Sequence, residues 1–115
     1  MPLPLLLHMI KKKEVLAGME TISAKELERL AADGGAVIID LRSPNEYARG
    51  HVRGAVNVPQ GNFSAGFPVR KDRPLVLYCE RGALSMAVAR ELERRGYRTK
   101  SVVGGYRAIS GGQIW

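Results

Sequence analysis

Short apolar runs alternate with amphipathic stretches along most of this chain. Residues 36–39, 75–78 and 99–103 are rich in β-branched or other apolar side chains, which predicts buried strands, and residues 52–58 contain another short strand. Between these runs, apolar positions three or four residues apart predict helices near residues 24–32 and from Ser85 onward. Strands that alternate with helices are typical of parallel βαβ units. The predicted fold class is therefore α/β, a small and mainly parallel central sheet with helices on both faces.

Two of the predicted helices carry start signals. Ser23 with Glu26, and Ser43 with Glu46, have the spacing of a capping box, in which the serine side chain and the glutamate satisfy backbone N–H groups at the helix start. Pro44 stands at the first helical position of the second of these helices. That helix is expected to be short, because Gly50 follows soon after it.

The length and composition predict one compact domain. The chain has 115 residues, of which 45% are hydrophobic and 25% are charged. Residues 1–18 do not follow the pattern, so we expect an N-terminal extension, loosely ordered, before a domain at 19–115. The apolar run in this extension is too short to cross a bilayer, and its basic residues come after the run rather than before it, unlike a secretory signal. No membrane span is expected.

The only cysteine, Cys79, directly follows the strand predicted at 75–78. Six residues, 79–84, form a tight loop before the helix predicted from Ser85. A strand, a short loop and a helix direct successive backbone N–H groups into one concavity, with the positive end of the helix dipole beneath it. A thiolate in that position would receive these donors, so Cys79 is interpreted as a nucleophile. The alternative is a small buried apolar residue at a strand end.

A single cysteine excludes an internal disulfide and an internal resolving thiol. No Cys/His cluster has metal-ligand spacing, so neither a metal nor a cofactor is expected. A free nucleophilic thiol suits a reducing compartment, which predicts a cytoplasmic location.

The formal net charge of +7 is concentrated in a few segments. Such a charge attracts anionic small molecules, acidic proteins or nucleic acid, but it is also typical of a solvated helix face and a basic tail. No aromatic side chains are interleaved with the charges, so no nucleic-acid partner is expected. The segments are Lys11–Lys13 and the arginines Arg90, Arg94, Arg95 and Arg98.

Three ordered segments resemble signatures of the rhodanese domains. Residues 37–47 (VIIDLRSPNEY) with 50–59 (GHVRGAVNVP) resemble the first signature of that family. The six-residue loop that Cys79 opens resembles the active-site loop, and residues 104–108 (GGYRA) resemble the C-terminal signature. The resemblance runs from about Thr21 to the end of the chain. It implies a small α/β domain and sulfurtransferase activity.

The resemblance also implies roles for individual residues. Cys79 would take a sulfane sulfur from thiosulfate or a persulfide and pass it to cyanide or to a thiol of the glutathione or thioredoxin kind. Asp40 and Arg42 would form a buried pair that supports loop geometry, and His51 is expected to be a turn residue rather than a base. Ser85 is expected to cap the helix and to donate its hydroxyl to the terminal sulfur. The loop residues expected to bind the substrate are Glu80, Arg81, Gly82, Ala83, Leu84 and Ser85.

Departures from the family pattern keep other functions open. Many relatives that use thiosulfate have a cation late in the loop, where this chain has Leu84; Arg81 is the only cation of the loop, and Glu80 opposes it. A phosphatase or arsenate reductase of similar fold would need a longer loop with an arginine six positions after the cysteine, where this chain has Ser85. A non-catalytic redox-sensing or protein-docking module remains the alternative to a sulfurtransferase.

Overall fold

The computed structural model describes residues 20–59 and 69–109. The extension predicted at 1–18 and most of the connection at 60–69 lie outside these residues. The strands are β1 (Glu20–Ile22), β2 (Val37–Asp40), β3 (Val56–Asn57), β4 (Leu75–Tyr78) and β5 (Thr99–Val102). The helices are α2 (Ala24–Asp33), α3 (Pro44–Arg49) and α4 (Ala83–Arg94), and a 3₁₀ turn, η2, spans Gly105–Ala108.

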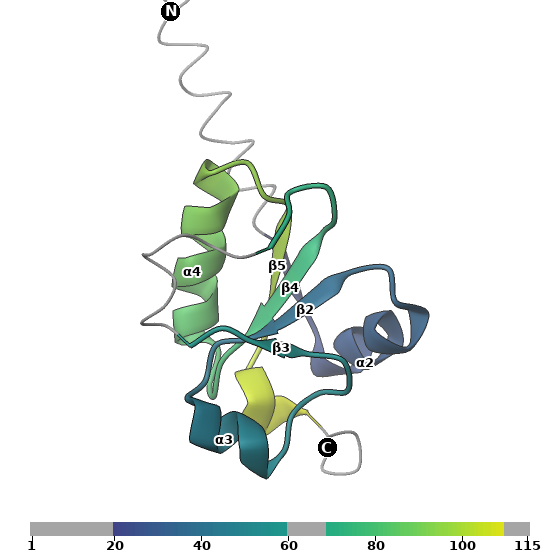
Figure 1. The fold of residues 1–115 in the computed structure, drawn as a ribbon, viewed down its shortest axis with the longest axis vertical. Coiled ribbons are helices and arrows are strands. Elements are labelled where there is room, and N and C mark those ends of the chain that lie inside the picture. The colour runs from purple at the N-terminus through teal and green to yellow at the C-terminus, as the bar shows by residue number, and fades with distance from the viewer. Residues whose placement is uncertain (1–19, 60–68, 110–115) are drawn as a thin grey trace, which may run out of the picture.

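The described strands form one parallel sheet in the order β1-β5-β4-β2-β3. The strand that leads to the cysteine, β4, is the middle strand and pairs with β2 and β5. All five strands point the same way, so the loops that follow them gather at one edge of the sheet. Figure 1 shows α3 and the yellow turn η2 together at that edge. The α/β class predicted from the sequence is confirmed.

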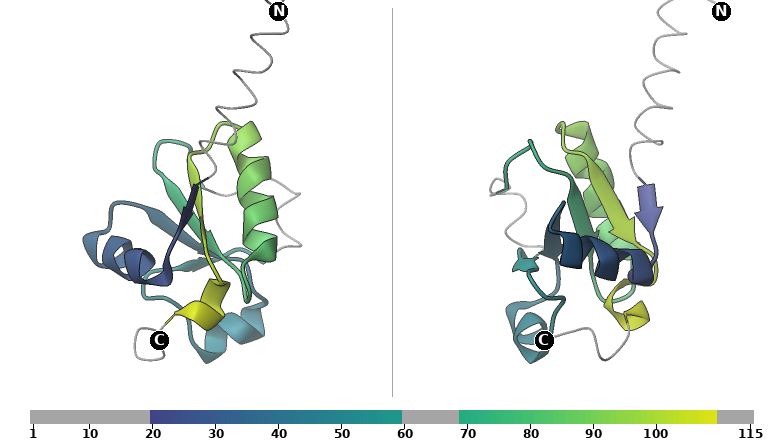
Figure 2. Two further views of the ribbon diagram at one scale, coloured as in Figure 1. Left: turned by 180° about the vertical axis from the view of Figure 1, so that it is seen from behind. Right: turned by 90° about the vertical axis from the view of Figure 1, so that its right-hand side faces the viewer.

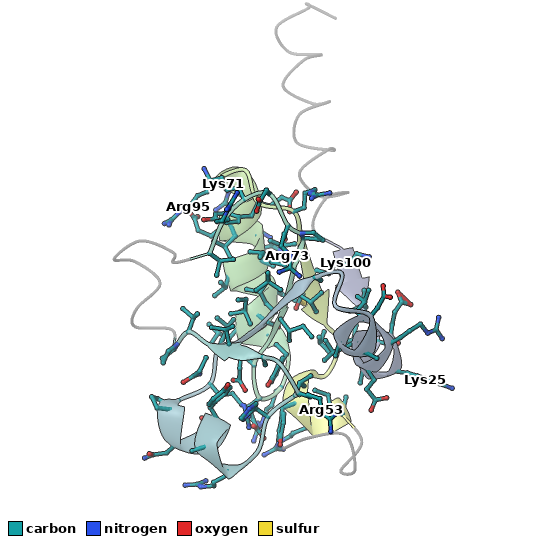
Figure 3. All side chains as sticks on the ribbon, turned by 45° about the vertical axis from the view of Figure 1, so that its right-hand side comes forward. Lys25, Arg53, Lys71, Arg73, Arg95 and Lys100 are labelled. Atoms are coloured by element: carbon teal, nitrogen blue, oxygen red, sulfur yellow. The ribbon has the colours of Figure 1, made fainter. Side chains whose placement is uncertain are left out.

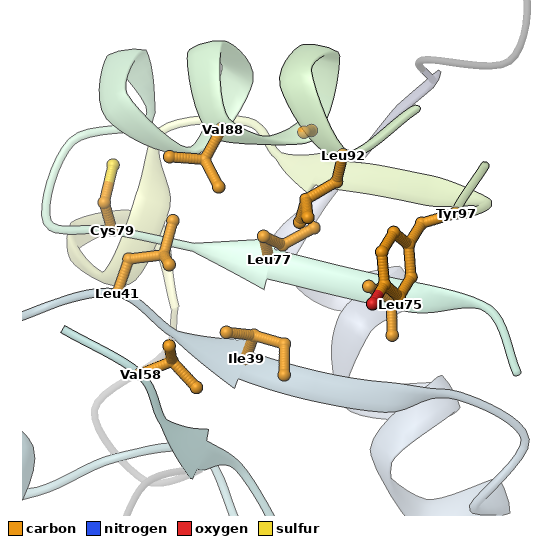
Figure 4. Close-up of a cluster of buried hydrophobic side chains, with 10 residues drawn as sticks. Ile39, Leu41, Val58, Leu75, Leu77, Cys79, Val88, Leu92 and Tyr97 are labelled. Atoms are coloured by element: carbon orange, nitrogen blue, oxygen red, sulfur yellow. The ribbon is translucent and has the colours of Figure 1, made fainter. Parts of the chain in front are cut away.

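Successive residues of the central strands point to opposite faces, and each face has its own apolar layer. On one face Leu75 and Leu77 pack with Val88 and Leu92 of α4. Cys79 lies at the end of the same row, beyond the end of β4 (Figure 4). On the other face Val76 and other buried side chains pack with α2. Figure 2 shows α2 and α4 on opposite sides of the sheet, as the alternation of strands and helices predicted.

The helix starts follow the predicted caps. The Ser23 side chain accepts a hydrogen bond from the backbone N–H of Glu26 at 3.1 Å. In α3 the capping box is complete: the Ser43 side chain accepts a hydrogen bond from the Glu46 N–H, and the Ser43 N–H donates to the Glu46 carboxylate at 3.1 Å. Gly34 ends α2 in the left-handed conformation, with φ of 73°. Local sequence alone is enough to place these helices.

Two differences from the predicted elements are informative. Residues 20–22 were not predicted as a strand, yet they form the edge strand β1 beside β5. The second concerns α4, which begins at Ala83 rather than Ser85, with Gly82 as its N-cap. Within residues 20–59 and 69–109, no helix is long and apolar enough to cross a membrane, and no three His, Cys, Asp or Glu side chains are grouped to hold a metal ion.

Candidate active site

The Cys79 side chain lies in a cup of backbone N–H groups at the carboxyl end of β4. Its Sγ accepts hydrogen bonds from the N–H of Gly82 at 3.1 Å and of Ser85 at 3.3 Å. Gly82 adopts φ of 110°, a conformation that side-chain-bearing residues rarely adopt. Cys79 itself is buried, with only 5% of its surface exposed. The cup therefore presents N–H dipoles to sulfur and leaves a narrow approach.

The turn η2 holds the cysteine loop from outside. The N–H groups of Tyr106 and Arg107 donate to the carbonyls of Cys79 and Glu80, at 2.7 and 3.2 Å. Gly105 makes this close approach possible: a Cβ built there would lie 2.4 Å from the Cys79 carbonyl oxygen. Because these carbonyls are held outward by η2, the N–H groups farther along the loop are free to face the sulfur.

The Ser85 side chain serves the loop in a different way from the one expected. Its hydroxyl is 3.0 Å from the Gly82 carbonyl and 2.7 Å from the hydroxyl of buried Ser101. The prediction that Ser85 caps the helix is wrong, because the N-cap position is held by Gly82, which has no side chain to cap with. The hydroxyl is directed to the loop backbone and to β5, while the backbone N–H of Ser85 contacts sulfur.

A buried ion pair lies beside the loop, at the end of β2. The Arg42 Nη2 and Nε atoms donate to the two carboxylate oxygens of Asp40, at 2.8 and 3.1 Å. Burial lowers the pKa of Arg42, but the hydrogen bond and charge of Asp40 outweigh it and raise the pKa above its usual value. Arg42 Nη2 also donates to the Gly50 carbonyl at 2.6 Å. The pair therefore ties the end of β2 to the end of α3.

The Tyr78 hydroxyl completes this network from β4. It donates to Asp40 at 2.5 Å and accepts from the N–H of Val52 at 3.1 Å. Burial, followed by the hydrogen bond to Asp40, raises the pKa of Tyr78 well above its usual value. The hydroxyl therefore keeps its proton at neutral pH and donates a hydrogen bond to Asp40. Tyr78, the residue before Cys79, is in this way fixed to the end of β2 and to the segment at Val52.

The carboxylate of Glu80 pairs with arginines from outside the loop. It lies 3.2 Å from Arg107 Nε and 3.8 Å from Arg42 Nη1. We expected Glu80 to oppose Arg81, but Arg81 is exposed and the Glu80 carboxylate pairs instead with Arg42, just after β2, and with Arg107 of η2. Arg107 was missed by the sequence analysis; its place in the GGYRA segment was the only available signal.

Two other predicted residues have clear places. Leu84 is partly buried and packs on the apolar layer that contains Cys79, so its side chain offers no polar group to an anion. The ring of His51 stacks on Tyr47 at 3.7 Å, and its Nδ1 lies 2.8 Å from the Tyr47 carbonyl. Both contacts are those of a turn residue.

Much of the basic surface lies away from this site. Figure 3 shows Lys71 and Arg95 at the end of the molecule opposite Arg53 and the turn η2. On α4, Glu91 pairs with Arg94 and Arg95 at 2.8 and 3.2 Å, which offsets part of the helix charge. Part of the positive charge of the described residues therefore lies away from the cysteine loop.

Comparison with known proteins gives consistent matches. The Rhodanese-like domain family matches residues 23–111. The human thiosulfate:glutathione sulfurtransferase is 32% identical over 108 residues, covering 80% of this chain and 94% of that protein. A tRNA sulfurtransferase of Desulfurococcus amylolyticus is 40% identical over 78 residues; the match covers 65% of this chain but only 16% of that longer protein. A crystal structure of a rhodanese homologue from Thermus thermophilus superposes with a TM-score of 0.60, at 33% identity, over 78% of this chain and all of that one.

Proposed function

Because the chain belongs to the rhodanese-like domain family, we propose that it is a sulfurtransferase in which Cys79 carries the sulfur. The observation that supports this most directly is the pair of backbone N–H groups, from Gly82 and Ser85, that point at Cys79 Sγ. Such donors stabilise negative charge on sulfur without any charged side chain. Both the thiolate and a persulfide carry that charge.

The proposed reaction has two displacements at sulfur. The Cys79 thiolate attacks the outer sulfur of thiosulfate; a Cys–S–S bond forms, the S–S bond of thiosulfate breaks, and sulfite leaves with the electron pair. An acceptor then attacks the terminal sulfur of the persulfide. The S–S bond to Cys79 breaks, and the Cys79 thiolate is regenerated as the leaving group. The product is thiocyanate when the acceptor is cyanide, and a new persulfide when the acceptor is a thiolate. No electrons are gained or lost overall, and no second cysteine is needed.

We propose that a persulfide is at least as good a sulfur donor for this site as thiosulfate. The only cation of the loop is the exposed Arg81, and Leu84 occupies the later position with an apolar side chain. At about 4 Å and a surface-like dielectric, one charge is worth at most a few kcal/mol, less after solvent screening. A doubly charged anion therefore gains little here, whereas the single negative charge of a persulfide group needs only the N–H donors around Sγ.

Asp40 and Arg42 are proposed to position the loop rather than to react. Both are buried and hydrogen-bonded to each other, and Arg42 contacts the Glu80 carboxylate. A buried pair of this kind holds neighbouring backbone in one arrangement. Ala83 and Arg81 are both exposed and are proposed to contact the substrate.

The test is the intact mass of the protein after incubation with thiosulfate and again after addition of cyanide. We expect a gain of one sulfur on Cys79, reversed by cyanide with release of thiocyanate. If thiosulfate gives no gain, the same measurement with glutathione persulfide assigns the donor. No gain from either would overturn sulfur transfer and favour a redox-sensing or docking module.

A further inference from the structure

A pocket of about 290 Å³ opens beside the cysteine loop, and the sulfur-transfer steps above do not use it. This volume is near the lower end for ligand sites, which suits one end of a small molecule. Glu80, the residue after Cys79, forms part of its wall, so the pocket adjoins the loop. Its lining residues are Arg42, Glu46, Arg49, Gly50, Glu80 and Tyr106.

The pocket carries two charges of each sign. Arg42 is at its base, with 5% of its side chain exposed, and its guanidinium lies 3.7 Å from the centre of the Tyr106 ring. Arg49, at the end of α3, is exposed. The two carboxylates belong to Glu46 and Glu80. A pocket with this balance discriminates against a simple anion, because each guanidinium that attracts the anion is accompanied by a carboxylate that repels it.

Neighbouring groups hold both carboxylates in place. Ser43 donates to Glu46 Oε1 from its backbone N–H and its hydroxyl, at 3.1 and 2.9 Å, and these hydrogen bonds lower the pKa of Glu46. Glu80 is held by Arg107 at 3.2 Å. Both carboxylates of the pocket therefore have a fixed position, set by Ser43 and by Arg107.

We propose that this pocket binds the zwitterionic amino-acid group of a low-molecular-weight thiol that accepts sulfur from Cys79. The carboxylate of that group faces Arg49 and Arg42, and its ammonium faces Glu46 and Glu80. The thiol then attacks the terminal sulfur of the Cys79 persulfide. This inference rests on the proposed function and names the acceptor class for the same site. In this arrangement the pocket binds the charged end of the acceptor, so the loop, with its single cation, does not have to.

The test compares acceptors on protein already loaded with sulfur. The persulfide form is prepared and verified by mass, and KM and kcat are measured with glutathione and with 2-mercaptoethanol, which has no charged group. In Arg49→Gln and Glu46→Gln we expect the ratio of KM for glutathione to KM for 2-mercaptoethanol to rise about five- to tenfold. Glutamine at position 46 keeps an oxygen for the Ser43 hydrogen bonds, so α3 remains capped.

Matched controls remove the same charges elsewhere. Lys25→Gln and Glu26→Gln lie on α2, where Figure 3 shows Lys25 pointing away from the molecule. In these controls we expect the KM ratio to stay within about twofold, because screened charges beyond about 10 Å contribute little. Control ratios that rise as much as those of the pocket variants would overturn the subsite and indicate a net-charge effect.

A substrate change isolates the ammonium contact. N-acetylglutathione lacks the positive charge on the γ-glutamyl end, so wild-type KM should rise about five- to tenfold, and Glu46→Gln should add no further increase. Unchanged ratios in the pocket variants, with sulfur loading intact, would overturn the subsite alone. Failure of the wild-type protein to load any sulfur would overturn the proposed function and this inference with it.

Discussion

Cys79 combines burial with a polar surrounding, and this decides how a reagent can reach it. Only 5% of the residue is exposed, and two N–H groups occupy the space around Sγ. Formation of a persulfide places a second sulfur about 2 Å farther out. A bulky acceptor therefore meets the terminal sulfur more easily than Sγ itself. This geometry favours sulfur transfer over direct disulfide formation at Cys79.

Replacing Cys79 with serine is predicted to abolish transfer and preserve the fold. Serine has a similar size but is a far weaker nucleophile at neutral pH. In Cys79→Ser we expect thiocyanate production from thiosulfate or glutathione persulfide to fall at least about a hundredfold. The thermal unfolding midpoint should stay close to wild type, since the substitution leaves the loop backbone unchanged. Near-full activity in the serine variant would contradict the proposed role of Cys79.

At the scale of elements, the loop depends on its neighbours β4 and α4 and on two segments that are distant in sequence, η2 and β5. The loop directly follows β4 and leads into α4, whose N-cap is Gly82. The turn η2 donates hydrogen bonds to the first two carbonyls of the loop. Ser101 of β5 contacts Ser85 from behind. The loop geometry therefore depends on the docking of η2 as well as on its own residues.

The contact between η2 and the loop is tested by Gly105→Ala. The new Cβ would lie 2.4 Å from the Cys79 carbonyl oxygen and 2.8 Å from the Arg81 nitrogen, so η2 must move away. We expect kcat/KM for sulfur transfer to fall at least about tenfold, measured well below the unfolding midpoint. Stability should fall as well.

Gly54→Ala is the matched control for that substitution. Gly54 has φ of 81°, comparable to 64° at Gly105, but a Cβ there would meet nothing within 4 Å. Both variants incur the cost of the left-handed conformation, about 1–2 kcal/mol. Only Gly105→Ala adds the clash. Equal losses of activity in the two variants would show that the η2 contact does not control the loop.

The apolar end of the loop is tested by Leu84→Arg. A cation at this position adds attraction for thiosulfate, so we expect its KM to fall about three- to tenfold. Because Leu84 packs on the core, the substitution should also lower the free energy of unfolding by about 1–2 kcal/mol. Leu84→Gln loses the same packing without gaining a charge. If both variants show the same KM for thiosulfate, the electrostatic argument is wrong.

On the scale of the whole molecule, the sheet topology collects the polar groups at one edge. Asp40 ends β2, Tyr78 ends β4, and the two residues are register partners in the parallel sheet. Their side chains meet Arg42 in a buried network that connects β2, β4 and α3. The network therefore supports the site and the global stability of the domain at the same time.

The global contribution of the network is tested by Tyr78→Phe. At neutral pH the variant should lose about 1–3 kcal/mol of unfolding free energy, because Asp40 loses a donor and the Val52 N–H loses its acceptor. The folded-state pKa of Tyr78 is raised above its usual value of 10.0, so its contribution is complete below pH 10 and declines as pH rises further.

Urea unfolding curves from pH 8 to 11 provide the measurement. Above about pH 10 the unfolded wild-type protein releases the Tyr78 proton, and the folded protein does not. The stability difference between wild type and Tyr78→Phe should therefore shrink by about 1.4 kcal/mol per pH unit. A difference that stays constant with pH would mean that Tyr78 ionises equally in both states.

Local patterns alone were sufficient for several parts of this protein. The apolar run predicted as a strand at Leu75–Tyr78 has the same bounds as β4, and Ser43 with Glu46 forms the predicted capping box. The apolar face of α4 is buried through Val88, Ala89 and Leu92. These features depend on residues within a few positions of one another, so periodicity and helix capping identify them. The position of Cys79 directly after a buried strand is likewise visible in the local sequence.

Local sequence patterns predicted the α/β class, most of its helices and strands, and the candidate cysteine. Which distant groups meet around that cysteine depends on tertiary packing. Residues 20–22 become a strand only because β5 provides an edge to pair with. Arg107 reaches Glu80, and Ser101 reaches Ser85, across 27 and 16 residues. No local pattern encodes such contacts, because they arise from the packing of η2 and β5 against the loop. The charge balance of the pocket beside Cys79 is a product of that packing.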